Sequence, residues 1–312
     1  MRKYLLKRTL ITLVTLIIII FVIFALVRVV PGNPFPTEKM TAEQIAQKRA
    51  EMGLDDPILV QFGRYMSNFV KGDFGVGTSL YQGAPIKSVL KCCVANSFKI
   101  GGFAVLMGVV PGIMFGIFSA LYKGGLFDKL CSVLSVIGIC LPTYVFLIFI
   151  QKFLAFDLGI FPPFFDEEEF FYSAFIPALS MGIFSFATVL KFTRNEMVDV
   201  LASDYIMLVE AKGVYGPAVI FKHALRNSLI PLITVIGPII VDLLTGAAVI
   251  ETIYGINGMG RVMVDAIVGD GIDYNYVLIL SIIYSSLYIL MMFALDILYG
   301  FIDPRVTACE EN

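Results

Sequence analysis

The sequence is poor in the residues on which most catalytic, metal and nucleotide sites depend. Its 312 residues include no tryptophan, a single histidine and only 15% charged side chains. The five cysteines lack the paired spacing of a zinc or iron–sulfur site. No G-x-x-x-x-G-K-[ST] motif occurs, so we expect the chain itself to bind no nucleotide. We therefore predict no catalytic residue, no bound cofactor and no metal, and a protein that is not an enzyme.

The abundant residues are apolar. Hydrophobic residues make up 58% of the sequence, which indicates a membrane protein that crosses the bilayer several times. The net charge of -2 gives no reason to expect a nucleic-acid partner. Six apolar segments can each cross a hydrocarbon layer roughly 30 Å thick. They cover about residues 10–30, 98–122, 130–156, 173–192, 230–250 and 276–301.

The basic residues predict the orientation of these segments. With the N-terminus inside, nearly all lysines and arginines at the membrane edges are cytoplasmic, and the short outer loops hold only Arg261, with Lys152 near the outer end of the third span. The predicted fold is therefore an all-α membrane protein with six transmembrane helices and cytoplasmic N- and C-termini. Its parts are a cytoplasmic start and first helix (1–30), an extracytoplasmic insert (31–96) and a five-helix core (97–312).

Two helices are predicted within the insert. Thr41 and Gln44 have the spacing of a capping box at the start of a polar helix. Pro57 can begin a second helix, which carries Phe62 and Tyr65 on one apolar side. We expect this second helix to lie on the membrane or against the helix bundle.

Small residues and prolines indicate how the spans pack and bend. The second span has a small residue at every fourth position, which predicts a seam of close helix packing. The seam residues are Ala104, Gly108, Gly112, Gly116 and Ala120. Pro111 and Pro142 remove hydrogen bonds from the second and third spans, so bent helices are expected. The fifth span is expected to be broken at Gly237–Pro238.

The segment 205–231 combines polar and apolar residues in a helix–break–helix pattern. Gly213 can take the left-handed position that ends the first helix. Gly216–Pro217 can start the second helix, which is expected to end near Arg226–Asn227, where cations complement the helix dipole. The first helix carries apolar side chains on more than one side. We therefore expect it to contact two partners.

This segment resembles the cytoplasmic coupling loop of ABC-importer permeases of the oligopeptide/dipeptide/nickel branch. In that branch the loop reads Ala-Lys-Gly, then His-Ala-Leu-Arg-Asn, then Ile-Pro. The same residues stand here at 211–213, 223–227 and 230–231. The resemblance implies a coupling loop over 194–229. It implies that the following residues carry the contact with an ATPase: Ala211, Lys212, Gly213, His223, Leu225, Arg226 and Asn227.

The resemblance extends over nearly the whole chain. The insert contains Gly72-Asp73-Phe74-Gly75, the last outer loop begins with Glu251-Thr252-Ile253-Tyr254, and the chain closes with Asp303-Pro304-Arg305, all as in the family. The resemblance implies a type I ABC-importer permease fold in a bacterial or archaeal cell (inner) membrane, surrounded by lipid. It also implies four protein partners: a second homologous permease subunit, two cytoplasmic ATPase subunits that hold ATP and Mg²⁺, and an extracytoplasmic substrate-binding protein.

The substrate is predicted to be an oligopeptide, because residues 237–240 and 243–246 look most like the oligopeptide subgroup. Dipeptides, nickel chelates and sugars are the alternatives within the same class. An intramembrane protease is a distant alternative, since Asp242 and Asp296 lie in apolar spans, but neither stands in an aspartyl-protease motif. An ion-coupled secondary transporter is another, although it gives no reason for a coupling loop.

Asp242 needs an explanation of its own. A carboxylate near the middle of a span costs several kcal/mol in contact with lipid, so it is expected to face the bundle interior. In one interpretation neighbouring helices tie it up with hydrogen bonds and it fixes packing. In the other it lines the translocation pathway, just below an outer gate near Glu251 and Tyr254.

Overall fold

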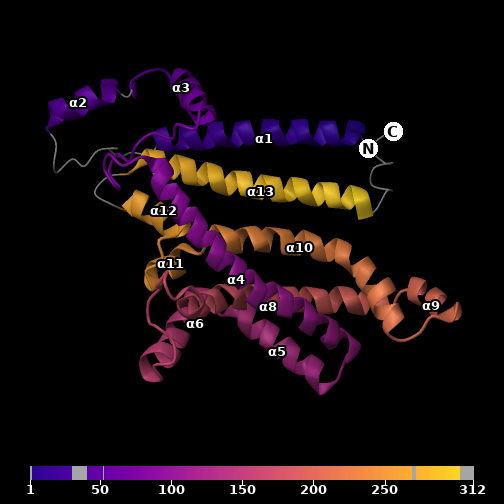
Figure 1. Cartoon of the computed structure of the whole chain (residues 1–312). Helices are drawn as coiled ribbons and strands as arrows, with labels where there is room; N and C mark the ends of the chain where they lie inside the picture. Colours follow the sequence, from indigo (N-terminus) through magenta and orange to yellow (C-terminus); the bar gives the residue numbers. More distant parts are fainter. Residues whose placement is uncertain (1, 30–40, 52, 269–271, 303–312) are drawn as a thin grey trace. The chain divides into compact units, whose positions relative to one another are not determined.

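The computed structural model describes residues 2–29, 41–51, 53–268 and 272–302 (Figure 1). Throughout these residues the regular structure is helical, with one isolated β-bridge between Val76 and Pro85. The chain forms two compact units. The core unit comprises Phe98–Ile256 and the chain from Ala294 onward, and the insert unit comprises Arg2–Ser97 and Asn257–Phe293.

The long helices confirm the predicted fold class. Among the described residues, five helices are long and apolar enough to cross a membrane, or six when a sharply bent helix pair is counted as one span. These are α1 (Arg2–Val29), α4 (Ile86–Leu121), the pair α5 (Leu126–Cys140) and α6 (Thr143–Ile150), α8 (Phe175–Leu201), α10 (Leu225–Thr245) with α11 (Ala248–Tyr254), and α13 (Tyr274–Ile302). The shorter elements are α2 (Ala42–Glu51), α3 (Ile58–Val70), α7 (Phe170–Ser173), α9 (Asp204–Ala211), α12 (Met259–Val268) and the π-helical turns η2 (Gln151–Asp157) and η3 (Val219–Ala224).

Both helices predicted for the insert are present. The capping box before α2 is formed, because the Thr41 N–H donates to Gln44 Oε1 at 3.0 Å and the Gln44 N–H donates to Thr41 Oγ1 at 3.4 Å. Helix α3 begins directly after Pro57. Its apolar side packs on α1, where the ring centroids of Phe62 and Phe24 lie 5.6 Å apart. Tyr65 packs against the same Phe24 ring, and burial raises the pKa of Tyr65 above its usual value.

The small-residue seam is confirmed as a close contact between α4 and α8. A Cβ atom added at Gly108 would lie 2.6 Å from the Gly182 carbonyl oxygen, and one added at Gly116 would lie 2.6 Å from Thr193 Cβ. Only glycine allows the two backbones to approach this closely. The helix itself begins at Ile86, earlier than residue 98, because polar residues at the end of the insert continue the helix beyond its apolar part.

The prolines act differently in different spans. Helix α4 continues through Pro111 without a break, whereas α5 and the helix that follows Pro142 meet at an angle of 102°. The bend expected at Pro142 is confirmed. At that point Leu141 has an extended backbone (φ -83°, ψ 119°), the conformation that proline favours in the residue before it.

The predicted break at Gly237–Pro238 is wrong. Helix α10 runs through both residues and ends at Thr245, and the chain turns at Gly246, where φ is +85°. Gly237 serves close packing instead, since a Cβ atom there would lie 2.6 Å from Leu295 Cδ1. Gly237 is therefore a site of close packing with Leu295. The local sequence could not indicate this contact, because Leu295 lies far along the chain.

Candidate functional site

Helix α9 ends with the glycine cap that the sequence predicts. Gly213 has φ +83°, its N–H donates to the Glu210 carbonyl at 2.9 Å, and the Val214 N–H donates to the Val209 carbonyl at 3.4 Å. This is the Schellman arrangement, with an apolar residue on each side of the cap. No atom lies within 4 Å of a Cβ placed at Gly213. The left-handed backbone, and not lack of space, is therefore what requires glycine here.

The apolar side chains of α9 are divided between two surroundings. Ile206 and Val209 are buried in a cluster of this chain that includes Met197 of α8 and residues of η3. The other large apolar side chains, Tyr205, Met207 and Leu208, are exposed, with exposed fractions of 43%, 64% and 55%. We name these three residues the open face of α9. Helix α9 thus has both buried and exposed apolar side chains.

The second helix of the loop contacts the first helix, α9. Gly216 (φ +68°) and Pro217 start the helix as predicted, and η3 leads directly into α10. The Tyr205 hydroxyl and His223 Nδ1 are 2.8 Å apart, so η3 is bonded to α9 across the loop. The hydrogen bond to His223 therefore helps to fix the position of Tyr205, one residue of the open face.

The helix does not end near Arg226–Asn227, and that expectation is wrong. The helix has a buried side at a spacing of four residues: Ala224, Ser228 and Leu232 are each 0% exposed. Packing of this side keeps the chain helical through Arg226 and Asn227. Among the residues predicted to contact an ATPase, His223 and Leu225 are half-buried. The others are exposed: Ala211, Lys212, Gly213, Arg226 and Asn227.

An ion pair that the sequence did not reveal joins three helices near this loop. The Arg194 guanidinium of α8 donates to both carboxylate oxygens of Asp128 of α5, at 3.0 Å and 2.9 Å. The Ser119 hydroxyl of α4 donates to the same carboxylate at 2.7 Å, and the Gly124 N–H donates at 2.8 Å. Asp128 is only 4% exposed. Its position in the first turn of a span was a weak signal, and only the fold pairs it with Arg194.

A cavity of about 340 Å³ lies between α6, α8, α10 and α11 of the core unit. Its wall is mostly apolar, with hydroxyls from Thr143, Ser185 and Thr245. Asp242 supplies the one carboxylate among the described residues that line it. No described residue donates a hydrogen bond to that carboxylate; only the backbone carbonyl of Asp242 accepts one, from Thr245. The Asp242 side chain is thus exposed at the cavity, and the described residues do not hold its carboxylate by hydrogen bonds.

Glu251 and Tyr254 do not lie in the wall of this cavity, although α11 contributes Ile250 to it. Their exposed fractions are 1% and 0%. The Tyr254 hydroxyl donates to the Pro162 carbonyl at 2.6 Å, and the Phe165 N–H donates to the Tyr254 carbonyl at 3.0 Å. The structure therefore uses Tyr254 to fix α11 to the loop before α7 and does not bring it together with Asp242.

Comparison with protein families gives two adjoining matches. Residues 112–308 match the family described as binding-protein-dependent transport system inner membrane component. Residues 1–100 match the family that describes the N-terminal part of the membrane component of such systems. Together these two matches cover the predicted insert and most of the predicted core.

Similar proteins match over the full length. The dipeptide transport system permease protein DppB of Lactococcus lactis subsp. cremoris is 36% identical over 306 residues, which cover 98% of this chain and 99% of that protein. The oligopeptide transport system permease protein OppB of Haemophilus influenzae is 34% identical over 307 residues, with coverages of 98% and 99%. The glutathione transport system permease protein GsiC of Salmonella paratyphi A is 32% identical over 309 residues, with the same coverages.

The fold is also similar to a solved structure. A chain of the MetNI methionine ABC transporter in inward-facing conformations superposes with a TM-score of 0.57 at 15% sequence identity. The match covers 71% of this chain and 100% of that chain. At this identity the match supports the fold alone.

Proposed function

The chain belongs to the family of binding-protein-dependent transport system inner membrane components, and from this premise we propose that it is the permease subunit of an ABC importer for oligopeptides. It is a multi-pass protein of the bacterial inner membrane. Its relatives are named for dipeptide, oligopeptide and glutathione transport, and all three substrates are peptides. Peptide import is the function these relatives share, and oligopeptides are the substrate class that we assign within it.

The open face of α9 is the observation that carries the coupling role. Large exposed apolar side chains in a connecting loop mark a protein–protein contact, since soluble surfaces rarely leave them uncovered. The face is held from behind by the Ile206 and Val209 contacts and by His223. We assign it to docking with one of two cytoplasmic ATPase subunits that bind ATP and Mg²⁺. This assignment places both termini in the cytoplasm and residues 31–96 outside.

Two continuous helices connect the open face with the cavity. In α8, Met197 packs beneath α9, and Ser185 lines the cavity twelve residues earlier, about 18 Å along the helix axis. In η3 and α10, Ala224 packs beneath α9, and Asp242 lines the cavity. A displacement of α9 by nucleotide binding would therefore be transmitted to the cavity wall through rigid elements.

We assign the cavity to the peptide pathway. Asp242 is exposed on the chain by itself, so a second homologous permease subunit would close the pathway over it. There the carboxylate would attract the amino terminus or a basic side chain of a peptide supplied by an extracytoplasmic substrate-binding protein. The three hydroxyls of the wall offer hydrogen bonds to peptide groups of any sequence.

The test is transport by the complete importer in proteoliposomes, with the second permease, both ATPases and the binding protein. We expect ATP-dependent accumulation of a labelled pentapeptide, and weaker accumulation of a labelled dipeptide. A preference for the dipeptide would contradict the oligopeptide assignment. Transport of neither peptide, in an assembled complex that hydrolyses ATP, would contradict peptide import itself.

A further inference from the structure

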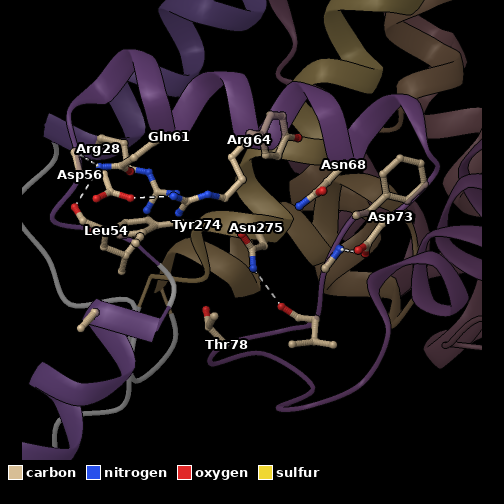
Figure 2. Close-up of a pocket in the computed structure, with 16 residues that line it drawn as sticks. Arg28, Leu54, Asp56, Gln61, Arg64, Asn68, Asp73, Thr78, Tyr274 and Asn275 are labelled. Carbon is tan, nitrogen blue, oxygen red and sulfur yellow. Dashed lines mark hydrogen bonds and ion pairs between the residues drawn. The ribbon is translucent and has the colours of Figure 1, made fainter.

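The insert unit contains a second cavity, with a volume of about 510 Å³ (Figure 2). Its wall is formed by α3, the turn at residues 73–78, the first residues of α13 and Arg28 at the end of α1. The volume lies in the range of small-molecule pockets, about 300–1,000 Å³. This wall is much more polar than that of the Asp242 cavity, and it uses none of the same residues.

Three buried polar atoms of this wall have no hydrogen-bond partner among the described residues: Arg28 Nε, Gln61 Oε1 and Thr78 Oγ1. Buried polar atoms are nearly always bonded in folded proteins, so each such atom asks for an explanation. That three of them line one cavity indicates that a polar ligand completes their hydrogen bonds.

The surrounding structure holds these atoms in place. Gln61 Nε2 donates to the Leu54 and Asp56 carbonyls, at 2.9 Å and 2.8 Å, so its amide oxygen is left as the unused end. Thr78 is 7% exposed, and its N–H donates to Asp273 Oδ2 at 2.7 Å. The turn is thus fixed by α13, and only the hydroxyl of Thr78 remains available.

The charges of the cavity complete the pattern. Arg64 and Asp56 neutralise each other at 2.7 Å. The Arg28 guanidinium lies 5.1 Å from the Phe24 ring centroid and 5.6 Å from that of Tyr274, and it forms no ion pair with any described residue. Asp73, at the other end of the cavity in Figure 2, accepts a hydrogen bond from the Gly75 N–H but likewise has no described cationic partner.

We propose that this cavity binds a short peptide with free termini. The peptide carboxylate meets Arg28, the ammonium group meets Asp73, and peptide N–H and C=O groups bond to Gln61 Oε1 and the Thr78 hydroxyl. One uncompensated charge of each sign in one cavity matches a zwitterion. The assignment to peptides rests on the proposed import function. It adds a peptide site on the permease itself, separate from the Asp242 cavity and from the binding protein.

The experiment measures calorimetric binding of trialanine to the assembled transporter without its binding protein, in phosphatidylcholine nanodiscs. We expect saturable binding, and affinities at least about tenfold lower for N-acetyl-trialanine and for trialanine amide, because each lacks one terminal charge. The key variant is Thr78→Val, which keeps the side-chain shape. It is expected to weaken trialanine binding by about fivefold to tenfold while leaving the unfolding temperature unchanged or higher, since an unpartnered buried hydroxyl is removed.

Asp55→Asn is the matched control, because Asp55 lies in the same insert and pairs with Arg49 outside the cavity wall. It should leave the dissociation constant unchanged. No saturable binding, equal binding of the blocked peptides, or an unchanged affinity in Thr78→Val would overturn the inference. Binding of dihexanoyl-phosphatidylethanolamine without trialanine binding would also overturn it, in favour of a lipid site. Pentapeptide uptake without trialanine binding would overturn this inference alone, whereas trialanine binding in a transporter that imports no peptide would overturn only the proposed import function.

Discussion

Helices α9, with eight residues, and α11, with seven, end in the same way. At the C-terminus of each helix a glycine, Gly213 or Gly255, has positive φ. The residue after the glycine donates its N–H to a carbonyl five residues earlier: Val214 to Val209 at 3.4 Å, and Ile256 to Glu251 at 2.8 Å. A Cβ at either glycine would meet nothing within 4 Å. The two caps are therefore equivalent in backbone conformation and in free space.

The two helices differ in how much apolar surface they expose: three large apolar side chains are exposed on α9 but only Val249 on α11. Helix α9 leaves Tyr205, Met207 and Leu208 exposed, whereas Tyr254 of α11 is fully buried and bonded to Pro162. The same local motif thus ends a helix in a docking loop and a helix in the packed core. The cap determines where each helix stops, and the burial of its sides determines what the helix can do.

The largest effect is expected from charge in the open face of α9. The double substitution Met207→Glu with Leu208→Glu should weaken copurification of the ATPase subunits by more than about 30-fold, because unpaired carboxylates would be buried in the contact. Leu59→Glu is the control, since Leu59 is 69% exposed on α3 of the insert. Normal ATPase copurification by the double variant would remove α9 from the docking contact.

The roles of the two glycine caps can be distinguished by making the same substitution at Gly213 and at Gly255. Valine at positive φ costs about 1–2 kcal/mol, so Gly213→Val should lower coupled uptake by a factor of about 5–30 while membrane insertion is kept. Gly213→Asn tolerates the left-handed backbone and should retain most of the uptake. Gly255→Val should instead lower the unfolding temperature without uncoupling ATP hydrolysis from uptake. Equal uncoupling by both valine variants would contradict a special role for α9.

A smaller effect is expected at Asp242, which lies on α10 between the two helices in the chain. Asp242→Asn keeps the shape and hydrogen-bonding capacity but removes the charge. Uptake of a basic pentapeptide should fall about fivefold, equivalent to ~1 kcal/mol, and uptake of an acidic pentapeptide should not fall. The two rates are compared at equal transporter levels. Equal effects on both peptides would count against the pathway role of the carboxylate.

The smallest effect on transport is expected at Tyr254. Tyr254→Phe removes the hydrogen bond to the Pro162 carbonyl and should lower the free energy of unfolding by about 1 kcal/mol. Uptake should stay at the wild-type level, because the hydrogen bond of Tyr254 holds α11 in the packed core. Thermal unfolding and uptake are measured on the same preparation. A selective loss of uptake with unchanged stability would assign Tyr254 to the gate instead.

What the sequence predicted correctly was local. Gly213, the capping box at Thr41 and the bend at Pro142 each follow from the backbone preferences of one or two residues. The break at Gly237–Pro238 was predicted wrongly, because that glycine packs closely against the side chain of Leu295, 58 residues later. The Asp128–Arg194 pair was missed for the same reason, since its partners are 66 residues apart. Contacts of this kind exist only once the helices have packed.

The glycine seam between α4 and α8 has a mechanical consequence. At Gly108 and Gly182 backbone meets backbone, so at this crossing no side chain has to change rotamer when the angle between the helices changes. The Asp128–Arg194 pair and Ser119 join the same two helices at a single point near the loop end. The glycine crossing can therefore act as a pivot. The angle between α4 and α8 can change there, while the Asp128–Arg194 pair and Ser119 keep the two helices together near the loop end.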